Sequence, residues 1–147
     1  MNDLRMKLVF RLDDIGFSVS IGDTVEILEA LPGWLARETA DPQRFLLGEM
    51  IHRGMSIAVR DLRRRVQLPP GRSGSDAAVL VLGGDENRFG LAADRIDGIF
   101  PETEFSSYPV PFQYVDGASP AYERIDIWRD EPLVALELRS LTGSWVV

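Results

Sequence analysis

The stretch of sequence that decides the fold reads Gly48-Glu49-Met50-Ile51-His52-Arg53-Gly54-Met55-Ser56-Ile57-Ala58-Val59-Arg60-Asp61-Leu62. An Arg-Gly pair separates two apolar segments, and the second continues as a short β-type run. Asp61 then opens a charged patch and is placed to cap a short helix over residues 62–66. The pattern predicts a strand–turn–strand unit that presents Arg53 to something outside the fold. It contains nothing typical of a catalytic centre, so we expect a protein that works by contact.

The same alternation of apolar and polar residues runs through the rest of the chain. Leu8, Phe10 and Leu12 fall on one side of a predicted strand, with Val9 and Arg11 opposite. A polar, Gly-containing turn follows, and a second alternating run from residue 17 to 21 completes a predicted hairpin. Further strands are expected at residues 57–59, 77–82, 89–96, within 101–120, at 125–128 and at 133–136. Residues 24–28 fit either a strand or one helical turn, and a terminal helix is expected at 137–141.

Many short strands with closely spaced turn signals, and few helices, indicate a mainly β protein built as a barrel or a sandwich. The strands are too numerous for one small barrel. Two linked barrels therefore fit the pattern best.

Composition limits the function further. The chain has 147 residues, a formal net charge of −7 and no cysteine. Its length fits one domain, and the lack of cysteine excludes disulfides and thiolate metal sites. The negative charge argues against nucleic acid as a partner. No apolar run is long enough to span a bilayer, so we expect no direct membrane insertion and a cytoplasmic location.

Candidate catalytic groups are few. His52 is the sole histidine, and no Gly-x-Ser-x-Gly motif accompanies it. We interpret it as a surface or interface ring rather than a catalytic or metal-binding one, because stable metal sites gather several ligands. The carboxylate pairs at 13–14, 85–86 and 102/104 fit solvated turns or edges, and the basic run 63–65 fits a solvated helix face or a docking patch. We predict no catalytic residue, no metal and no cofactor.

Taken together, the segments resemble the CheW-like family, the adaptors of bacterial chemosensory arrays. The resemblance runs from Leu8 to Leu141 and rests on the order and spacing of several elements. These elements are Leu8-Val9-Phe10-Arg11-Leu12, Phe17-Ser18-Val19, Glu26-Ile27, Gly48, Arg53-Gly54, Ile57-Ala58-Val59-Arg60-Asp61-Leu62-Arg63, Pro69, Val79-Leu80-Val81, Phe89-Gly90-Leu91-Ala92-Ala93-Asp94-Arg95-Ile96 and Leu136-Glu137-Leu138-Arg139-Ser140-Leu141.

The resemblance implies a fold and a function. It implies two five-stranded, SH3-like β-barrels over a shared hydrophobic core, forming one CheW-like domain over residues 1–147. The middle of the chain, roughly 20–80, would form one barrel, and the N-terminal strand with roughly 81–141 the other. The implied function is a non-enzymatic adaptor. It would couple the regulatory domain of a CheA-type histidine kinase to the cytoplasmic tips of methyl-accepting chemoreceptors.

The resemblance also suggests partner-binding residues. Arg53 would donate hydrogen bonds to a helical receptor hairpin in a groove between the barrels, and Gly54 would keep the turn tight. Glu26, Gly48 and Ile99 fall at positions that the family associates with receptor or kinase contact. A local ion pair is the alternative role of Arg53. For Asp61 and Asp94, capping or turn hydrogen bonds are the expected roles.

The chain departs from the family pattern at several positions. Thr24 replaces the usual Val, Ile51-His52 stand where Asn-Leu is common, Ala58 replaces Pro and Glu137 replaces Asp. These departures fall partly on the partner-facing segment. They leave open a second hypothesis, an interaction module in a non-flagellar pathway such as surface motility, without receptor contact. A small-molecule-binding barrel or enzyme is a third, and the missing catalytic groups weigh against it.

Overall fold

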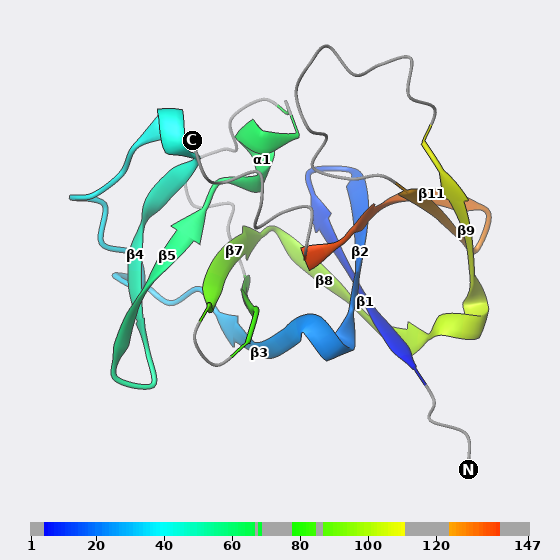
Figure 1. The fold of residues 1–147 in the computed structure, drawn as a ribbon, viewed down its shortest axis with the longest axis horizontal. Coiled ribbons are helices and arrows are strands. Elements are labelled where there is room, and N and C mark those ends of the chain that lie inside the picture. The colour runs from blue at the N-terminus through cyan, green and yellow to red at the C-terminus, as the bar shows by residue number, and fades with distance from the viewer. Residues whose placement is uncertain (1–4, 67, 69–77, 85–86, 111–123, 139–147) are drawn as a thin grey trace.

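The computed structural model describes residues 5–66, 68, 78–84, 87–110 and 124–138, which form two β-sheets (Figure 1). The six-stranded sheet has the order β8-β1-β2-β11-β10-β9, and its strands are β1 Met6–Leu12, β2 Ile15–Ser20, β8 Arg95–Pro101, β9 Phe105–Pro109, β10 Arg124–Trp128 and β11 Glu131–Leu136. The five-stranded sheet has the order β3-β6-β7-β5-β4, and its strands are β3 Thr24–Glu29, β4 Leu46–His52, β5 Met55–Arg60, β6 Ala78–Leu82 and β7 Phe89–Ala93. The predicted mainly β class is confirmed, with six described strands where five were expected in one of the sheets.

Short helical turns connect the strands. They are η1 Ile21–Asp23, η2 Pro42–Arg44, α1 Leu62–Arg65 and η3 Glu102–Glu104. The side chain of Asp61 accepts the backbone N–H of Arg64 at 3.1 Å, which confirms the predicted cap of α1. Residues 24–28 belong to a strand, β3. The predicted helix at 137–141 lies mostly outside the described residues.

The shared core follows from the period-2 alternation. Leu8, Phe10 and Leu12 of β1 are at most 1% exposed and pack in one cluster with Leu80 and Leu82 of β6, from the other sheet. The residues at the alternate positions belong to a second, smaller apolar cluster on the other face of each sheet. In the five-stranded sheet that cluster holds Met50, Ile57, Val59, Val79 and Val81, and in the six-stranded sheet it holds Val9, Trp128 and Leu133. Each sheet therefore has its own interior, and one apolar layer joins the two.

The chain passes between the sheets at two points. β2 of one sheet leads through η1 to β3 of the other, and β7 is separated from β8 by Asp94 alone. The expected boundary near residue 80 therefore differs from the sheet boundary, because β6 and β7 both pair within the five-stranded sheet. The predicted N-terminal hairpin is present as β1 and β2, and both strands belong to the six-stranded sheet, whereas the barrel division implied by the resemblance placed only the N-terminal strand there. Sequence alternation alone does not distinguish one strand over 89–96 from two strands that diverge at a bend.

Parallel pairings complete both sheets. β5 pairs with β7 through Val59↔Gly90 and Arg60↔Leu91, and β11 pairs with β2. Each pair joins strands that are distant along the chain. Such contacts form only when the whole domain folds, because closing a long loop costs entropy that local contacts do not recover.

Arg63 links α1 to the junction between the sheets. It is 9% exposed, and its guanidinium donates to Asp13 in the β1–β2 turn at 2.7 Å and to Asp94 between β7 and β8. The expected solvated face for the basic run 63–65 is therefore wrong for Arg63. Leu62 and Arg63 are the buried residues of α1, whereas Arg64 is exposed. Asp94 makes an ion pair as well as the expected turn hydrogen bond, in which it accepts the backbone N–H of Asp13.

Candidate functional site

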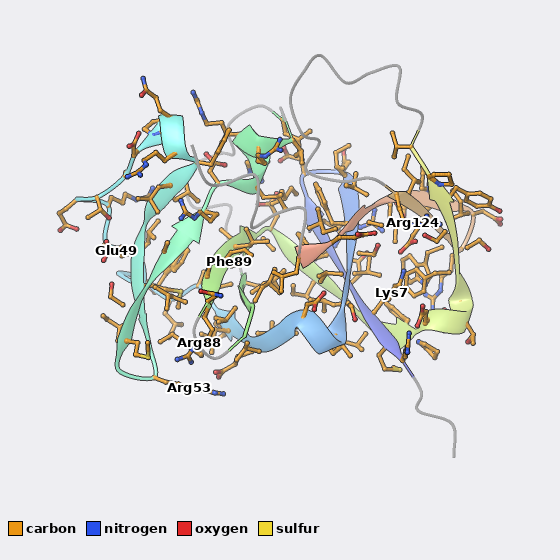
Figure 2. All side chains as sticks on the ribbon, viewed as in Figure 1. Lys7, Glu49, Arg53, Arg88, Phe89 and Arg124 are labelled. Atoms are coloured by element: carbon orange, nitrogen blue, oxygen red, sulfur yellow. The ribbon has the colours of Figure 1, made fainter. Side chains whose placement is uncertain are left out.

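The β4–β5 hairpin ends in a two-residue turn made by Arg53 and Gly54. Both have positive φ, 51° and 77°, and His52 pairs with Met55 across the turn. This is the backbone of a type I′ turn, whose twist matches that of the two strands. Gly suits the second position because it has no Cβ to clash. The predicted strand–turn–strand unit is present, and the Arg53 side chain is 61% exposed at its tip (Figure 2).

Glu26 of β3 lies beside this turn. Its Oε1 is 2.8 Å from Nε2 of His52 and 3.3 Å from a guanidinium nitrogen of Arg53. The hydrogen bond from His52 has the largest effect on the pKa of the Glu26 carboxyl, and it lowers that pKa. Together with the positive charge of Arg53, it outweighs desolvation and holds the pKa of Glu26 below its ordinary value. Glu26 and Arg53, both predicted site residues, are therefore in direct contact.

His52 is buried, with 3% of its surface exposed, so the expected surface position of its ring is wrong. β4 turns alternate residues inward, and His52 follows Met50 on the interior side. A guanidinium nitrogen of Arg88 is 3.1 Å from its Nδ1, and another nitrogen of Arg88 is 3.1 Å from Sδ of Met55. Through these two contacts Arg88 meets the residues that flank the Arg53-Gly54 turn on both sides. Sequence reasoning missed Arg88, because 36 residues separate it from His52 and no local pattern marks it.

Two apolar side chains flank the charged turn. Ile51 is 70% exposed and Met55 is 50% exposed. Ile51 points outward because the residues on either side of it in β4, Met50 and His52, both point inward. The tip of the hairpin thus combines an exposed cation with exposed apolar surface, the composition that is enriched at binding hot spots and their borders.

Gly48 is buried in β4, away from the turn. Its φ is 153°, and a Cβ on it would lie 2.1 Å from the carbonyl oxygen of Ala36. Ala36 and Glu49 exchange two backbone hydrogen bonds of 2.8 Å at this place. The glycine therefore lets the segment before β4 lie directly against the strand.

Ile99 lies on β8 in the six-stranded sheet, opposite Leu8 of β1, and is 43% exposed. The structure thus places Glu26 of β3 beside Arg53 and Gly54 at the tip of the β4–β5 hairpin. Gly48 sits behind that hairpin, and Ile99 belongs to the other sheet.

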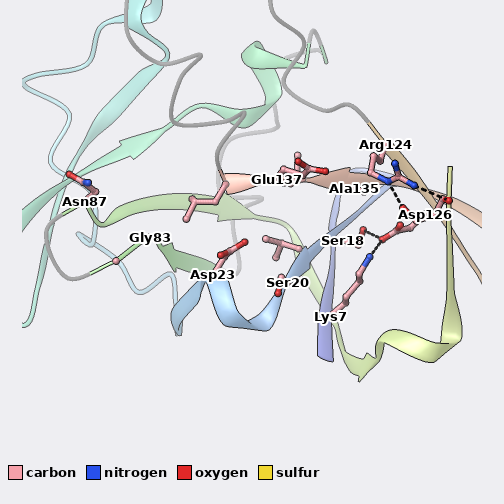
Figure 3. A pocket seen from close by; sticks show the side chains of 15 residues that line it. Lys7, Ser18, Ser20, Asp23, Gly83, Asn87, Arg124, Asp126, Ala135 and Glu137 are labelled. Carbon is pink, nitrogen blue, oxygen red and sulfur yellow. Dashed lines mark hydrogen bonds and ion pairs between the residues drawn. The ribbon is translucent and has the colours of Figure 1, made fainter. Parts of the chain in front are cut away.

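A separate polar cavity of about 700 Å³ is lined by β1, β2 and β10 and by the loop after β6 (Figure 3). Asp126 is fully buried in its wall, and its Oδ2 accepts hydrogen bonds from Lys7 and Ser18, each at 2.7 Å. Arg124 donates to the hydroxyl of Ser107 at 2.8 Å. These contacts tie four strands of one sheet together, β1, β2, β9 and β10. No group of three metal-ligating side chains occurs among the described residues.

Two barrel-type sheets on a common core, with a charged and apolar hairpin tip, are the features of a protein that can act as a scaffold by binding other proteins. A family model described as the CheW-like domain matches residues 7–108, and the chain belongs to that family. Its members are scaffold and adaptor proteins of chemotaxis signalling and not enzymes. The match extends from β1 to β9 and so takes in strands of both sheets.

The fold is similar to that of a solved scaffolding protein, TtCheW from Thermoanaerobacter tengcongensis. The TM-score is 0.73 at 22% sequence identity, over 94% of this chain and 87% of that chain. This likeness confirms the predicted fold of two SH3-like barrels. Comparison with curated protein sequences gave no match. Within the part of the chain that the structure describes, no helix is both long and apolar enough to cross a membrane.

Proposed function

We propose that this chain is a cytoplasmic adaptor that couples the regulatory domain of a CheA-type histidine kinase to the tips of chemoreceptors. Membership of the CheW-like family supports an adaptor role in general. The single observation that supports contact with a chemoreceptor is the exposed Arg53 on a two-residue turn. Its guanidinium would donate charge-assisted hydrogen bonds to acceptors on a helical receptor hairpin.

Arg53 would exchange its ion pair with Glu26 for hydrogen bonds to such a partner. Its ion pair with Glu26 is 3.3 Å long, and both side chains are partly exposed, 61% and 36%. Exposed ion pairs of this kind contribute little to stability, because water screens the two charges. Hydrogen bonds to charged groups in an interface contribute about 1.5–3 kcal/mol, so exchange toward a partner is favourable.

The other predicted residues would have supporting roles. Glu26 would orient Arg53, and Gly54 leaves open space beside the turn, with no atom within 4 Å of an added Cβ. Gly48 would act indirectly by holding β4 against the Ala36 segment. Ile99 would supply apolar contact from the second barrel, where it is 43% exposed.

The test measures binding to the kinase regulatory domain and to receptor tips separately. R53A should weaken receptor binding about tenfold or more, because a charge-assisted hydrogen bond is lost, and should leave kinase binding unchanged. R37A is the matched control, since Arg37 is also exposed but lies in the connection between β3 and β4. Circular dichroism would establish that both variants remain folded.

The outcomes separate the hypotheses. Kinase binding without receptor binding by the unmodified protein would favour an interaction module in another pathway. If the protein bound neither partner, the adaptor proposal would be wrong. An equal loss for R53A and R37A would show that Arg53 has no special part in the contact.

A further inference from the structure

The ring of His52 is held between an acceptor and a donor. A guanidinium nitrogen of Arg88 lies 3.1 Å from Nδ1, and a guanidinium can only donate hydrogen bonds. Nδ1 must therefore present its lone pair, which places the single proton of the neutral ring on Nε2. Nε2 then donates to Oε1 of Glu26 at 2.8 Å. The two contacts together specify the neutral Nε2–H tautomer.

A second proton on the ring cannot be accommodated with both contacts in place. Protonated Nδ1 becomes a donor, so Arg88 would face both a second donor and a like charge. The contact between Arg88 and Nδ1 must therefore open; another nitrogen of the same guanidinium donates to Sδ of Met55 at 3.1 Å. The Glu26 contact has the opposite response, because a charged donor strengthens a hydrogen bond to a carboxylate.

The charged groups around His52 come from three elements. Among the described residues they are Glu26 of β3, Arg53 of the turn and Arg88 just before β7. Two guanidiniums face one carboxylate, which leaves one net positive charge around the neutral ring and two around the protonated ring. Glu49 of β4 is engaged on the other side of the strand, where it accepts from Ser56 at 2.6 Å.

We propose that His52 is a positioning residue for the Glu26–Arg53 pair, and that protonation of its ring releases Arg88 and increases the affinity of the hairpin for an anionic partner. The inference about affinity rests on the proposed function. The release of Arg88 does not depend on the proposed function.

The first experiment needs no partner. His52 is the sole histidine, so the tag-free, ¹⁵N-labelled protein gives one imidazole signal set, whose nitrogen shifts identify the tautomer. We expect Nε2–H at pH 8 and an upward shift of the titration midpoint in R88M, which removes the donor to Nδ1 and keeps a similar stem. An Nδ1–H tautomer, or a midpoint that R88M does not move, would overturn the proposal.

The second experiment measures receptor-tip binding between pH 8 and pH 5.5, with H52Q as the matched control. A Gln carboxamide also offers one donor and one acceptor end, so it can join Glu26 to Arg88, but it does not titrate. We expect the affinity of the unmodified protein to rise by up to about fivefold as the pH falls, the upper end for one exposed ion pair. H52Q should show no such rise beyond the response of the partner itself.

The outcomes of the two experiments are distinguishable. Equal pH profiles for the unmodified protein and H52Q would refute the effect on affinity. Loss of receptor binding at every pH, with the expected tautomer and R88M shift, would overturn the proposed function and the inference about affinity while leaving the release of Arg88 intact.

Discussion

Replacement of Arg63 by methionine should strongly destabilise the protein. Arg63 has only 10% of its side chain exposed, and it pairs with Asp94, which is 16% exposed, and with Asp13, which is 55% exposed. Burial disfavours the guanidinium charge, but the bonds with Asp94 and Asp13 outweigh it and raise the pKa of Arg63. The buried charge of Arg63 is therefore compensated by the two carboxylates, and the carboxylate of Asp94 is compensated by Arg63.

The size of the effect follows from burial. Removing one member of a buried pair costs about 3–5 kcal/mol, because the other charge is left desolvated. Asp94 keeps some exposure and still accepts a backbone N–H of Asp13, so about 3 kcal/mol is expected for R63M. The exposed Asp13 pair contributes at most about 1 kcal/mol, so D13N should cost no more than that. Asn also tolerates the positive φ of 53° at this position.

Urea unfolding followed by tryptophan fluorescence and circular dichroism measures these differences. R64M is the matched control on the same helix, because Arg64 is exposed, and it should change stability by less than about 0.5 kcal/mol. The double variant R63M/D94N should be more stable than R63M, since it removes the charge of a carboxylate that has lost its guanidinium partner. If R63M were as stable as R64M, the ion pair would not be what stabilises this junction. The same would follow if adding D94N to R63M lowered the free energy of unfolding by as much as D94N does alone.

Two further predictions concern stability. G48A should destabilise by about 2 kcal/mol or more in the same urea assay, because the new Cβ would lie 2.1 Å from the Ala36 carbonyl oxygen at a strained φ; a neutral result would mean that the two segments separate without cost. Stability should also fall below about pH 4.3, the ordinary Glu value. The hydrogen bond from Arg11 lowers the pKa of Glu131, and arginine hydrogen bonds outweigh burial to lower that of Asp97. Their stabilisation is therefore present at neutral pH and lost on acidification. E131Q should flatten this part of the pH profile, and an unchanged slope would contradict the pairing.

Much of the fold and part of the site could be predicted from short stretches of sequence. Apolar residues at alternate positions identified the strands and the side of β1 that enters the shared core. The Arg53-Gly54 turn and the Asp61 cap were predicted correctly, because both depend on the backbone preferences and hydrogen bonds of residues within a few positions of one another.

Tertiary structure alone decided how distant segments meet. The break at Asp94 assigns β7 and β8 to different sheets, although the sequence alternates almost continuously through it. His52 and Arg63 are polar residues, yet both are buried because groups far along the chain satisfy them. Burial of a charge is favourable only where partners compensate its desolvation. The sequence by itself therefore determined the strands and the outward arginine, and only the folded chain determined which charges surround them.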